Sequence, residues 1–191
     1  NCKTAEMIKY SANCLLATMI SFSNEIANLC SAIGDIDVID VMQGVHLDKR
    51  LTPILADGER IYPDFVKFIE AGCGFGGSCF PKDLKALRAF GVQNGQPMAI
   101  LGSVVDINAN QYKQVTDLLY KHFPDLNNIK VAVLGLAFKP GTDDVRESPA
   151  IPVLKELLSG SAKIKAFDPV AVEETRKLFK NQSIEYCQNL E

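Results

Sequence analysis

A long helical repeat of apolar residues at the start of the chain constrains the fold most. Apolar side chains recur at intervals of three and four from Thr4 to Ile33, the spacing of one face of an α-helix. Gly34 follows, as expected at a helix C-terminus. Residues 14–20 are apolar nearly all round the helix. We therefore expect residues 4–33 to form one long helix that packs against a second subunit in a homodimer.

Further helices are predicted up to residue 123. Asp35 is expected to cap a short helix over 36–44, and residues 98–122 are predicted to form a second long helix. Weaker patterns indicate helices over 64–70 and 81–90. The first region, residues 1–123, is therefore expected to be all helical.

The hydrophobic period changes after a linker that ends at residue 128. Strand and helical patterns then alternate, and in chain order they cover 129–136, 148–158, 163–167, 170–180 and 184–186. This alternation predicts a parallel sheet with right-handed crossovers. The chain is thus assigned to the α/β class, with an all-helical region followed by a partial Rossmann-like region over 124–191.

Composition narrows the classes of function. With 47% hydrophobic and 23% charged residues the chain resembles an ordinary soluble protein. The net charge is −3 and the cations are dispersed, so we expect no nucleic-acid partner. The longest apolar run, residues 14–22, is too short to span a membrane. Six cysteines without a CxxC pair and two histidines predict no metal site and a reducing, cytoplasmic compartment.

A glycine-rich segment carries the first candidate for chemistry, Cys79. Four glycines precede it, at 72, 74, 76 and 77, and they allow close approach of a ligand. Pro81 suits the first turn of a helix, so Cys79 lies just before a helix N-terminus, where the dipole and Lys82 favour a thiolate. Asp83 follows one turn later, as a base on water or as a helix cap. The pattern fits a nucleophilic thiol and also fits a structural cysteine.

Two further groups of polar residues are candidates for a site. Lys9 and Asn13 are four apart on the first helix and share one face, where a cation and an amide together stabilise an oxyanion; the alternative is a surface lysine with a polar neighbour. Lys139 and Arg146 lie on the loop after the first strand, where α/β proteins bind ligands. Residues 135–141 lack the dinucleotide-binding pattern, and we identify no such fingerprint elsewhere.

Taken together, three segments in order resemble the UDP-glucose/GDP-mannose dehydrogenase family. They are TAEMIKYSAN at 4–13, GFGGSCFPKD at 74–83 and LGLAFKPGTDDVRESPA at 134–150. The family oxidises a sugar C6 alcohol to the acid with two NAD. The resemblance implies that the thiol at position 79 forms a thiohemiacetal and then a thioester, which retains the aldehyde for the second oxidation.

The same resemblance assigns roles to individual residues. Catalysis is implied for Cys79, Lys9, Asn13 and Asp83. Binding of the nucleotide sugar is implied for Lys9, Asn13, Arg50, Glu70, Phe75, Gly76, Phe138 and Lys139. Contacts to NAD are implied for Cys79, Lys82 and Arg146. Arg50 resembles an arginine that reaches the substrate of the partner subunit.

The sequence departs from the family in what it lacks. The NAD-binding N-terminal domain has no counterpart, and the nucleotide-sugar domain is expected to be cut short, so the chain is predicted to be a fragment that is inactive alone. UDP-glucose is the expected substrate. GDP-mannose and a non-catalytic dimeric nucleotide-binding module remain alternatives. Ser78 argues against UDP-N-acetylhexosamines, whose enzymes typically have His there.

Overall fold

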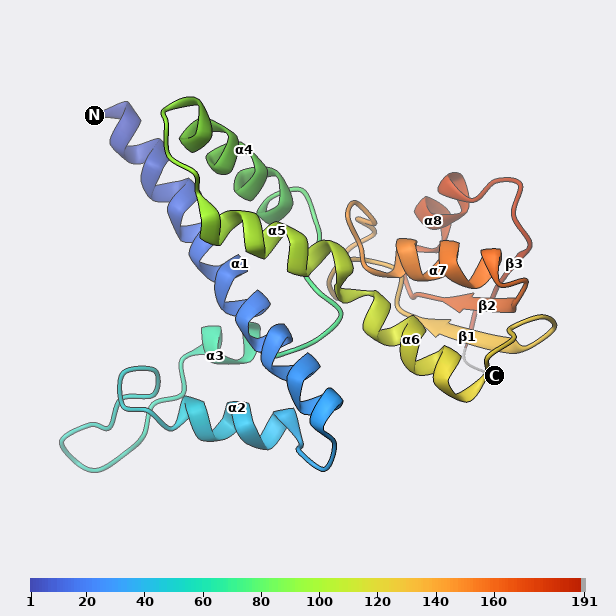
Figure 1. Cartoon of the computed structure of the whole chain (residues 1–191), viewed down its shortest axis with the longest axis horizontal. Helices are drawn as coiled ribbons and strands as arrows, with labels where there is room; N and C mark the ends of the chain where they lie inside the picture. The colour runs from blue at the N-terminus through green and yellow to red at the C-terminus, as the bar shows by residue number, and fades with distance from the viewer. Residues whose placement is uncertain (190–191) are drawn as a thin grey trace.

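The protein is described here by a computed structural model of residues 1–189 (Figure 1). The last two residues of the region predicted over 124–191 lie outside the described part. Two hydrophobic cores form, one among the first helices and one in the α/β region. The predicted α/β class, with helices first and a small parallel sheet after them, is confirmed.

The first core lies where three helices meet. Helix α1 (Cys2–Ile33) packs against α4 (Phe80–Gln93) and α5 (Ala99–Gln111). The buried side chains come from all three helices and from the segment between them: Cys14, Ala17, Ile20, Ile69, Phe75, Leu84, Leu101 and Val104. The predicted long helix is confirmed, and Gly34 ends it with a φ of 80° that suits glycine.

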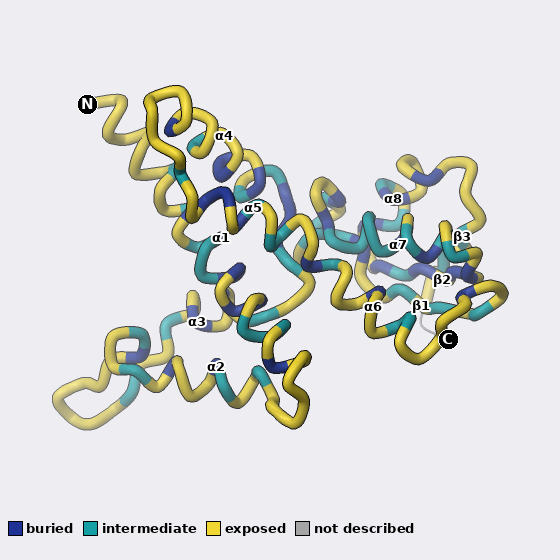
Figure 2. Tube along the Cα trace, viewed as in Figure 1, coloured by how far each residue is buried: buried dark blue, intermediate teal, exposed yellow. Residues whose placement is uncertain are grey.

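Helix α2 (Val38–His46) belongs to an arm that extends away from this core (Figures 1 and 2). Helix α3 (Asp64–Phe68) returns to the core, where Phe68 packs edge-on against Phe80 of α4. The expected cap at Asp35 is wrong. Asp35 has a φ of 57°, and together with Gly34 it reverses the chain, so the helix begins later. Asp37 is the cap, and its carboxylate accepts a 2.8 Å hydrogen bond from the backbone N–H two residues on.

The single helix predicted over 98–122 is interrupted at Tyr112. Helix α5 ends before it and α6 (Lys113–His122) follows. At the break, the N–H of Val115 bonds to the carbonyl of Tyr112 at 3.1 Å, which is the tighter i→i+3 spacing. The periodicity predicted the helical conformation on both sides and missed this change.

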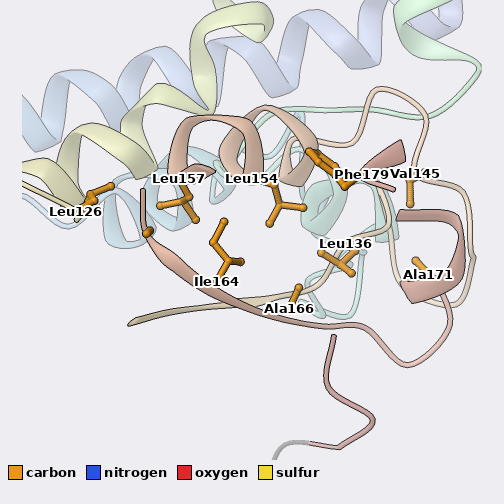
Figure 3. Close-up of a cluster of buried hydrophobic side chains, with 10 residues drawn as sticks. Leu126, Leu136, Val145, Leu154, Leu157, Ile164, Ala166, Ala171 and Phe179 are labelled. Atoms are coloured by element: carbon orange, nitrogen blue, oxygen red, sulfur yellow. The ribbon is translucent and has the colours of Figure 1, made fainter. Parts of the chain in front are cut away.

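The second region is a three-stranded sheet with helices between the strands. Its elements are β1 (Lys130–Leu134), α7 (Ala150–Ser159), β2 (Lys163–Phe167), α8 (Val172–Leu178) and β3 (Ile184–Tyr186). The strands are all parallel and lie in the order β1-β2-β3. Figure 3 shows Leu154 and Leu157 of α7 packed over Ile164 of β2. Among the described residues, no helix is both long and apolar enough to cross a bilayer.

Candidate functional site

Cys79 occupies the N-cap position of α4 and is exposed. Its carbonyl accepts the hydrogen bond from Asp83 N–H at 2.9 Å, which is the first turn of the helix. The two glycines with φ near +100° and +81°, Gly74 and Gly77, turn the chain into this position at no steric cost. The thiol therefore lies at the positive end of the α4 dipole, as the sequence predicted.

Asp83 is fully buried and receives three side-chain donors. Asn13 Nδ2 donates to its Oδ2 at 2.6 Å, and Lys9 Nζ donates to the same oxygen. Lys82 Nζ donates to Oδ1 at 2.7 Å. Burial opposes ionisation of Asp83, but the hydrogen bonds from Lys82, Lys9 and Asn13 outweigh it and lower its pKa to about 2. Asp83 is therefore an ionised carboxylate that joins α1 to α4, not a helix cap.

The loop after β1 packs directly on the cysteine loop. Gly77 N–H donates to the Arg146 carbonyl at 2.8 Å. The Phe138 ring covers Gly77 so closely that a Cβ there would lie 2.7 Å from it. Lys85 and Glu147 add a salt bridge of 3.2 Å across the same contact. The helical and α/β regions therefore meet at the candidate site.

Two hollows lie on either side of this contact. The smaller, about 360 Å³, is lined by Cys79 together with Glu70, Phe75, Gly76, Phe138 and Lys139. The larger, about 980 Å³, is lined by Ser78, Lys82, Arg146 and Asn108 among others, and Phe75 reaches this one too. The cysteine loop contributes residues to both hollows. Ser78 lines both hollows, whereas Cys79 lines the smaller one.

Comparison with family models assigns this architecture. Residues 3–110 match the model described as UDP-glucose/GDP-mannose dehydrogenase family, central domain, and residues 132–191 match the UDP binding domain of the same family. The chain belongs to the UDP-glucose/GDP-mannose dehydrogenase family. The three sequence motifs thus lie in a member of the family that they resemble.

Several relatives of this family member are similar over nearly its whole length. UDP-glucose 6-dehydrogenase TuaD of Bacillus subtilis is 41% identical over 97% of the chain, which covers 37% of that relative. UDP-glucose 6-dehydrogenase AglM of Haloferax volcanii is 43% identical over 92% of the chain, again 37% of the relative. The solved UDP-glucose dehydrogenase of Pyrobaculum islandicum superposes with a TM-score of 0.83 at 39% identity, over 97% of this chain and 40% of that one. The chain thus spans about two-fifths of these relatives.

Most of the residues predicted for the dehydrogenase site do come together. Lys9, Asn13, Lys82 and Asp83 share hydrogen bonds, and the remaining candidates on the two loops line the hollows. Arg50 is separate. It lies on the exposed arm after α2, where its guanidinium pairs with Asp48 at 2.6 Å, so this chain does not bring it to Cys79 by any described contact.

The glycine-rich segment before Cys79 contradicts one prediction made from the sequence. Gly72, Gly74 and Gly77 have the G-x-G-x-x-G spacing of a dinucleotide-binding pattern, although no such pattern was predicted in this chain. The segment follows α3 instead of a strand, so it lacks the strand–turn–helix setting in which this spacing binds a dinucleotide. The prediction that no segment of the chain has this spacing is therefore wrong.

Asp168 holds the backbone next to the candidate site, a role that the sequence did not predict. It directly follows β2, and its carboxylate accepts backbone hydrogen bonds from Leu136, Ala137, Val170 and Ala171 at 2.8 to 3.2 Å. Burial opposes its ionisation, but these donors outweigh burial and lower its pKa. Asp168 thus fixes the backbone just before Phe138. An aspartate at the end of a predicted strand was the available signal.

Proposed function

We propose that this chain supplies the catalytic cysteine and the nucleotide-sugar site of an NAD-dependent 6-dehydrogenase that oxidises UDP-glucose to UDP-glucuronate. The observation that carries the proposal is the position of Cys79. The thiol is exposed at the N-terminus of α4 and shares a hollow with Glu70, Phe138 and Lys139.

The chemistry required of Cys79 follows from oxidation in two steps. After the alcohol has become an aldehyde, the thiolate adds to the aldehyde carbon and forms a thiohemiacetal. This adduct then loses its hydroxyl proton, and its carbon-bound hydrogen leaves with two electrons as a hydride, for which NAD would be the acceptor; the product is a thioester. Water then cleaves the C–S bond to give the carboxylate and the free thiol. The exposed thiol at the N-terminus of α4 is the group that begins these steps.

Lys9 and Asn13 are proposed to stabilise the oxygen that is oxidised. An ammonium has three donors, and Lys9 directs one of them at Asp83. The Lys9 side chain is 51% exposed, so its other donors remain available to a substrate oxygen. With a pKa of about 2, Asp83 is a weak base, and we propose that it mainly orients Lys9 and Asn13.

The residues of the larger hollow fit a phosphate-bearing cofactor. Lys82 and Arg146 line it beside Ser78, and both cations are largely exposed although each pairs with a carboxylate. We propose that they would contact NAD, which accepts the hydride in each oxidation when bound. Because the chain matches the central and UDP-binding parts of the family, we propose that the main NAD site lies outside these 191 residues.

UDP-glucose is the proposed substrate because of the relatives. Two UDP-glucose 6-dehydrogenases are 41% and 43% identical to the chain. A GDP-mannose dehydrogenase of Pseudomonas aeruginosa is 35% identical over 91% of the chain and 36% of its own length, with a TM-score of 0.52.

For the compartment, we propose the cytoplasm, because a thiol that must stay reduced fits a reducing environment.

A homodimer through α1 is proposed from one exposed stripe. Spacings of four and three alternate without a break along the helix, through Ile8, Ala12, Leu15, Met19, Phe22, Ile26, Leu29 and Ile33. This is the repeat by which helices pair in coiled coils. Leu15 and Phe22 are more than half exposed in the single chain, so a second copy would cover them. Arg50 is proposed to reach the substrate of that partner.

The experiment that tests the function is turnover by the full-length natural protein. We expect NADH formation with UDP-glucose, little with GDP-mannose, and loss of uronate in Cys79→Ser. Cys2→Ser is the matched control, because Cys2 is also exposed but lies at the start of α1. Uronate formation by Cys79→Ser at the wild-type rate would remove the thiol from the mechanism. Binding of nucleotide sugars by the full-length protein without any NAD reduction would identify a binding module instead. NAD reduction by the 191-residue chain alone would refute the prediction that this chain is inactive by itself.

A further inference from the structure

The turn before the cysteine loop is held by side-chain amides of neighbouring helices. Asn108 of α5 accepts from Phe75 N–H at 2.8 Å and donates to the Phe75 carbonyl at 3.0 Å. Its amide therefore satisfies both backbone polar groups of one loop residue, as a neighbouring β-strand would. Both distances lie in the ordinary range for an N–H···O hydrogen bond.

A second set of amides fixes Gly72, three residues earlier. Gly72 N–H donates to Asn24 Oδ1 at 2.7 Å, and its carbonyl accepts from Gln111 Nε2 at 2.9 Å. Asn28 pairs with Gln111 through two further hydrogen bonds of 3.0 and 3.3 Å. Asn24 and Gln111 are buried. Glu25, the neighbour of Asn24, is exposed, whereas the Asn24 amide holds the loop.

The approach of Asn108 to the loop explains one of the glycines. Gly74 has a φ of 100°, and a Cβ at this position would lie 2.7 Å from Asn108 Oδ1. A side chain at position 74 would therefore push the amide away from Phe75. Asn108 and Gly74 form a matched pair in which each permits the other.

Phe75 transmits this constraint to the site. Its side chain lines both hollows, and its ring stacks edge-on with that of Phe80, the residue after Cys79, at a centroid distance of 5.8 Å. The next residues, Gly76 and Gly77, pack on the loop after β1. The position of Phe75 therefore bears on where Cys79 lies in the smaller hollow.

We propose that Asn108 is a positioning residue for Cys79, acting through the backbone of Phe75. Asn108 itself is only partly buried and lines the edge of the larger hollow, so filling the core does not require an amide there. The kinetic part of this proposal rests on the proposed dehydrogenase function, whereas the structural part does not.

Hydrogen exchange on the 191-residue chain tests the structural part. We expect Asn108→Ala to speed exchange of the Phe75 amide while β1 and the middle of α1 keep their protection. Asn108→Asp keeps the acceptor for Phe75 N–H but turns a carboxylate oxygen toward the Phe75 carbonyl, so its effect on this amide should be smaller than that of alanine. Asn110→Ala is the control, because that exposed amide donates to Asp106 within α5.

Kinetics of the full-length protein test the catalytic part. A displaced reacting group costs about 10²-fold in rate, so we expect kcat with UDP-glucose to fall by about that factor in Asn108→Ala. A purely structural role would lower the melting temperature and leave kcat per folded molecule intact.

The outcomes separate this proposal from the proposed function. Wild-type exchange at Phe75 in Asn108→Ala would overturn the positioning role, and so would wild-type kcat in an active enzyme. If the wild-type protein oxidises no nucleotide sugar, the proposed function fails, and the exchange measurement still decides whether Asn108 holds the loop. If Asn108→Ala does not fold, Asn108→Asp replaces it in the exchange measurement, because aspartate has nearly the volume of asparagine. Exchange at residues 75–77 of Asn108→Asp that is equal to or slower than in the wild type would then refute the positioning role.

Discussion

Asn13 Nδ2 donates to Asp83 Oδ2 across 2.6 Å, although the two residues are 70 positions apart in the chain. The bond joins the middle of a face of α1 to the first turn of α4, and Lys9 shares the same oxygen. Two of the three segments that resemble the family are therefore one structural unit. Substitutions in this unit should affect folding as well as any catalysis.

Asp83→Asn is expected to destabilise the fold. The amide cannot accept from both Lys9 and Lys82, since one of its two ends becomes a donor. Hydrogen bonds to charged groups contribute about 1.5–3 kcal/mol each, so the free energy of unfolding should fall by about that amount. Urea denaturation measures the change. Asp117→Asn, on the exposed side of α6, is the control, and an unchanged midpoint for Asp83→Asn would contradict the buried pairing.

Acid should unfold the protein partly through Asp83. Its pKa in the folded state, about 2, lies below the ordinary value of 3.8. Its ionised form thus stabilises the fold fully above pH 3.8, and this stabilisation is lost as the pH falls toward about 2. Asp144, whose pKa is lowered to about 2 chiefly by its hydrogen bond with Arg146, acts in the same direction. Urea midpoints measured across this interval should fall less steeply in Asp83→Asn than in the wild type; parallel curves would argue against a role of Asp83.

Gly76→Ala is expected to disturb the contact between the cysteine loop and the loop after β1. A Cβ at Gly76 would lie 2.9 Å from Phe138 Cβ and closer still to the carbonyl oxygen of Glu147. Such overpacking typically costs about 1–3 kcal/mol. Gly72→Ala is a matched control, because a Cβ there meets nothing within 4 Å. Thermal unfolding of both variants gives the comparison, and equal melting temperatures would show that the two loops do not pack as described.

Phe22→Asp is expected to weaken the proposed dimer. Phe22 lies near the middle of the exposed stripe on α1 and is 52% exposed in the single chain. Burial of a phenylalanine contributes about 1.5–3 kcal/mol, and the aspartates of two copies would repel each other if they faced one another. Sedimentation equilibrium reports the dissociation constant. Ile100→Asp removes an exposed apolar side chain of α5 instead and should leave the constant unchanged; equal effects of the two substitutions would argue against the stripe.

Local patterns predicted much of the fold. The helix over 4–33 and the strands over 163–167 and 184–186 agree with α1, β2 and β3, because hydrophobic spacing along one element depends on neighbours a few residues away. The errors fall where another part of the chain intervenes. At Tyr112 the preceding residue, Gln111, is held by Gly72 and Asn28, and no periodicity along residues 98–122 contains that information.

The residue types of the candidate site were also visible in the sequence, but their state was not. The sequence is compatible with two roles for Asp83, a base on water and a helix cap. In the structure Asp83 is a carboxylate paired with Lys9 and Asn13 of another helix. No sequence pattern distinguishes Asn108 from other polar residues on helices. It is a candidate positioning residue only because the fold places its amide on the backbone of Phe75.

Three features follow from the amino-acid sequence alone: the long first helix, the change to alternating strands and helices, and the placement of Cys79 at the start of a helix. Each of these depends on the intrinsic preferences of residues close together in the chain. The ionisation of Asp83, the two hollows at the cysteine loop and the amides that hold this loop follow only from the folded arrangement. These depend on distances between residues far apart in the chain, which are set by the packing of α1, α4 and α5 and of the loop after β1.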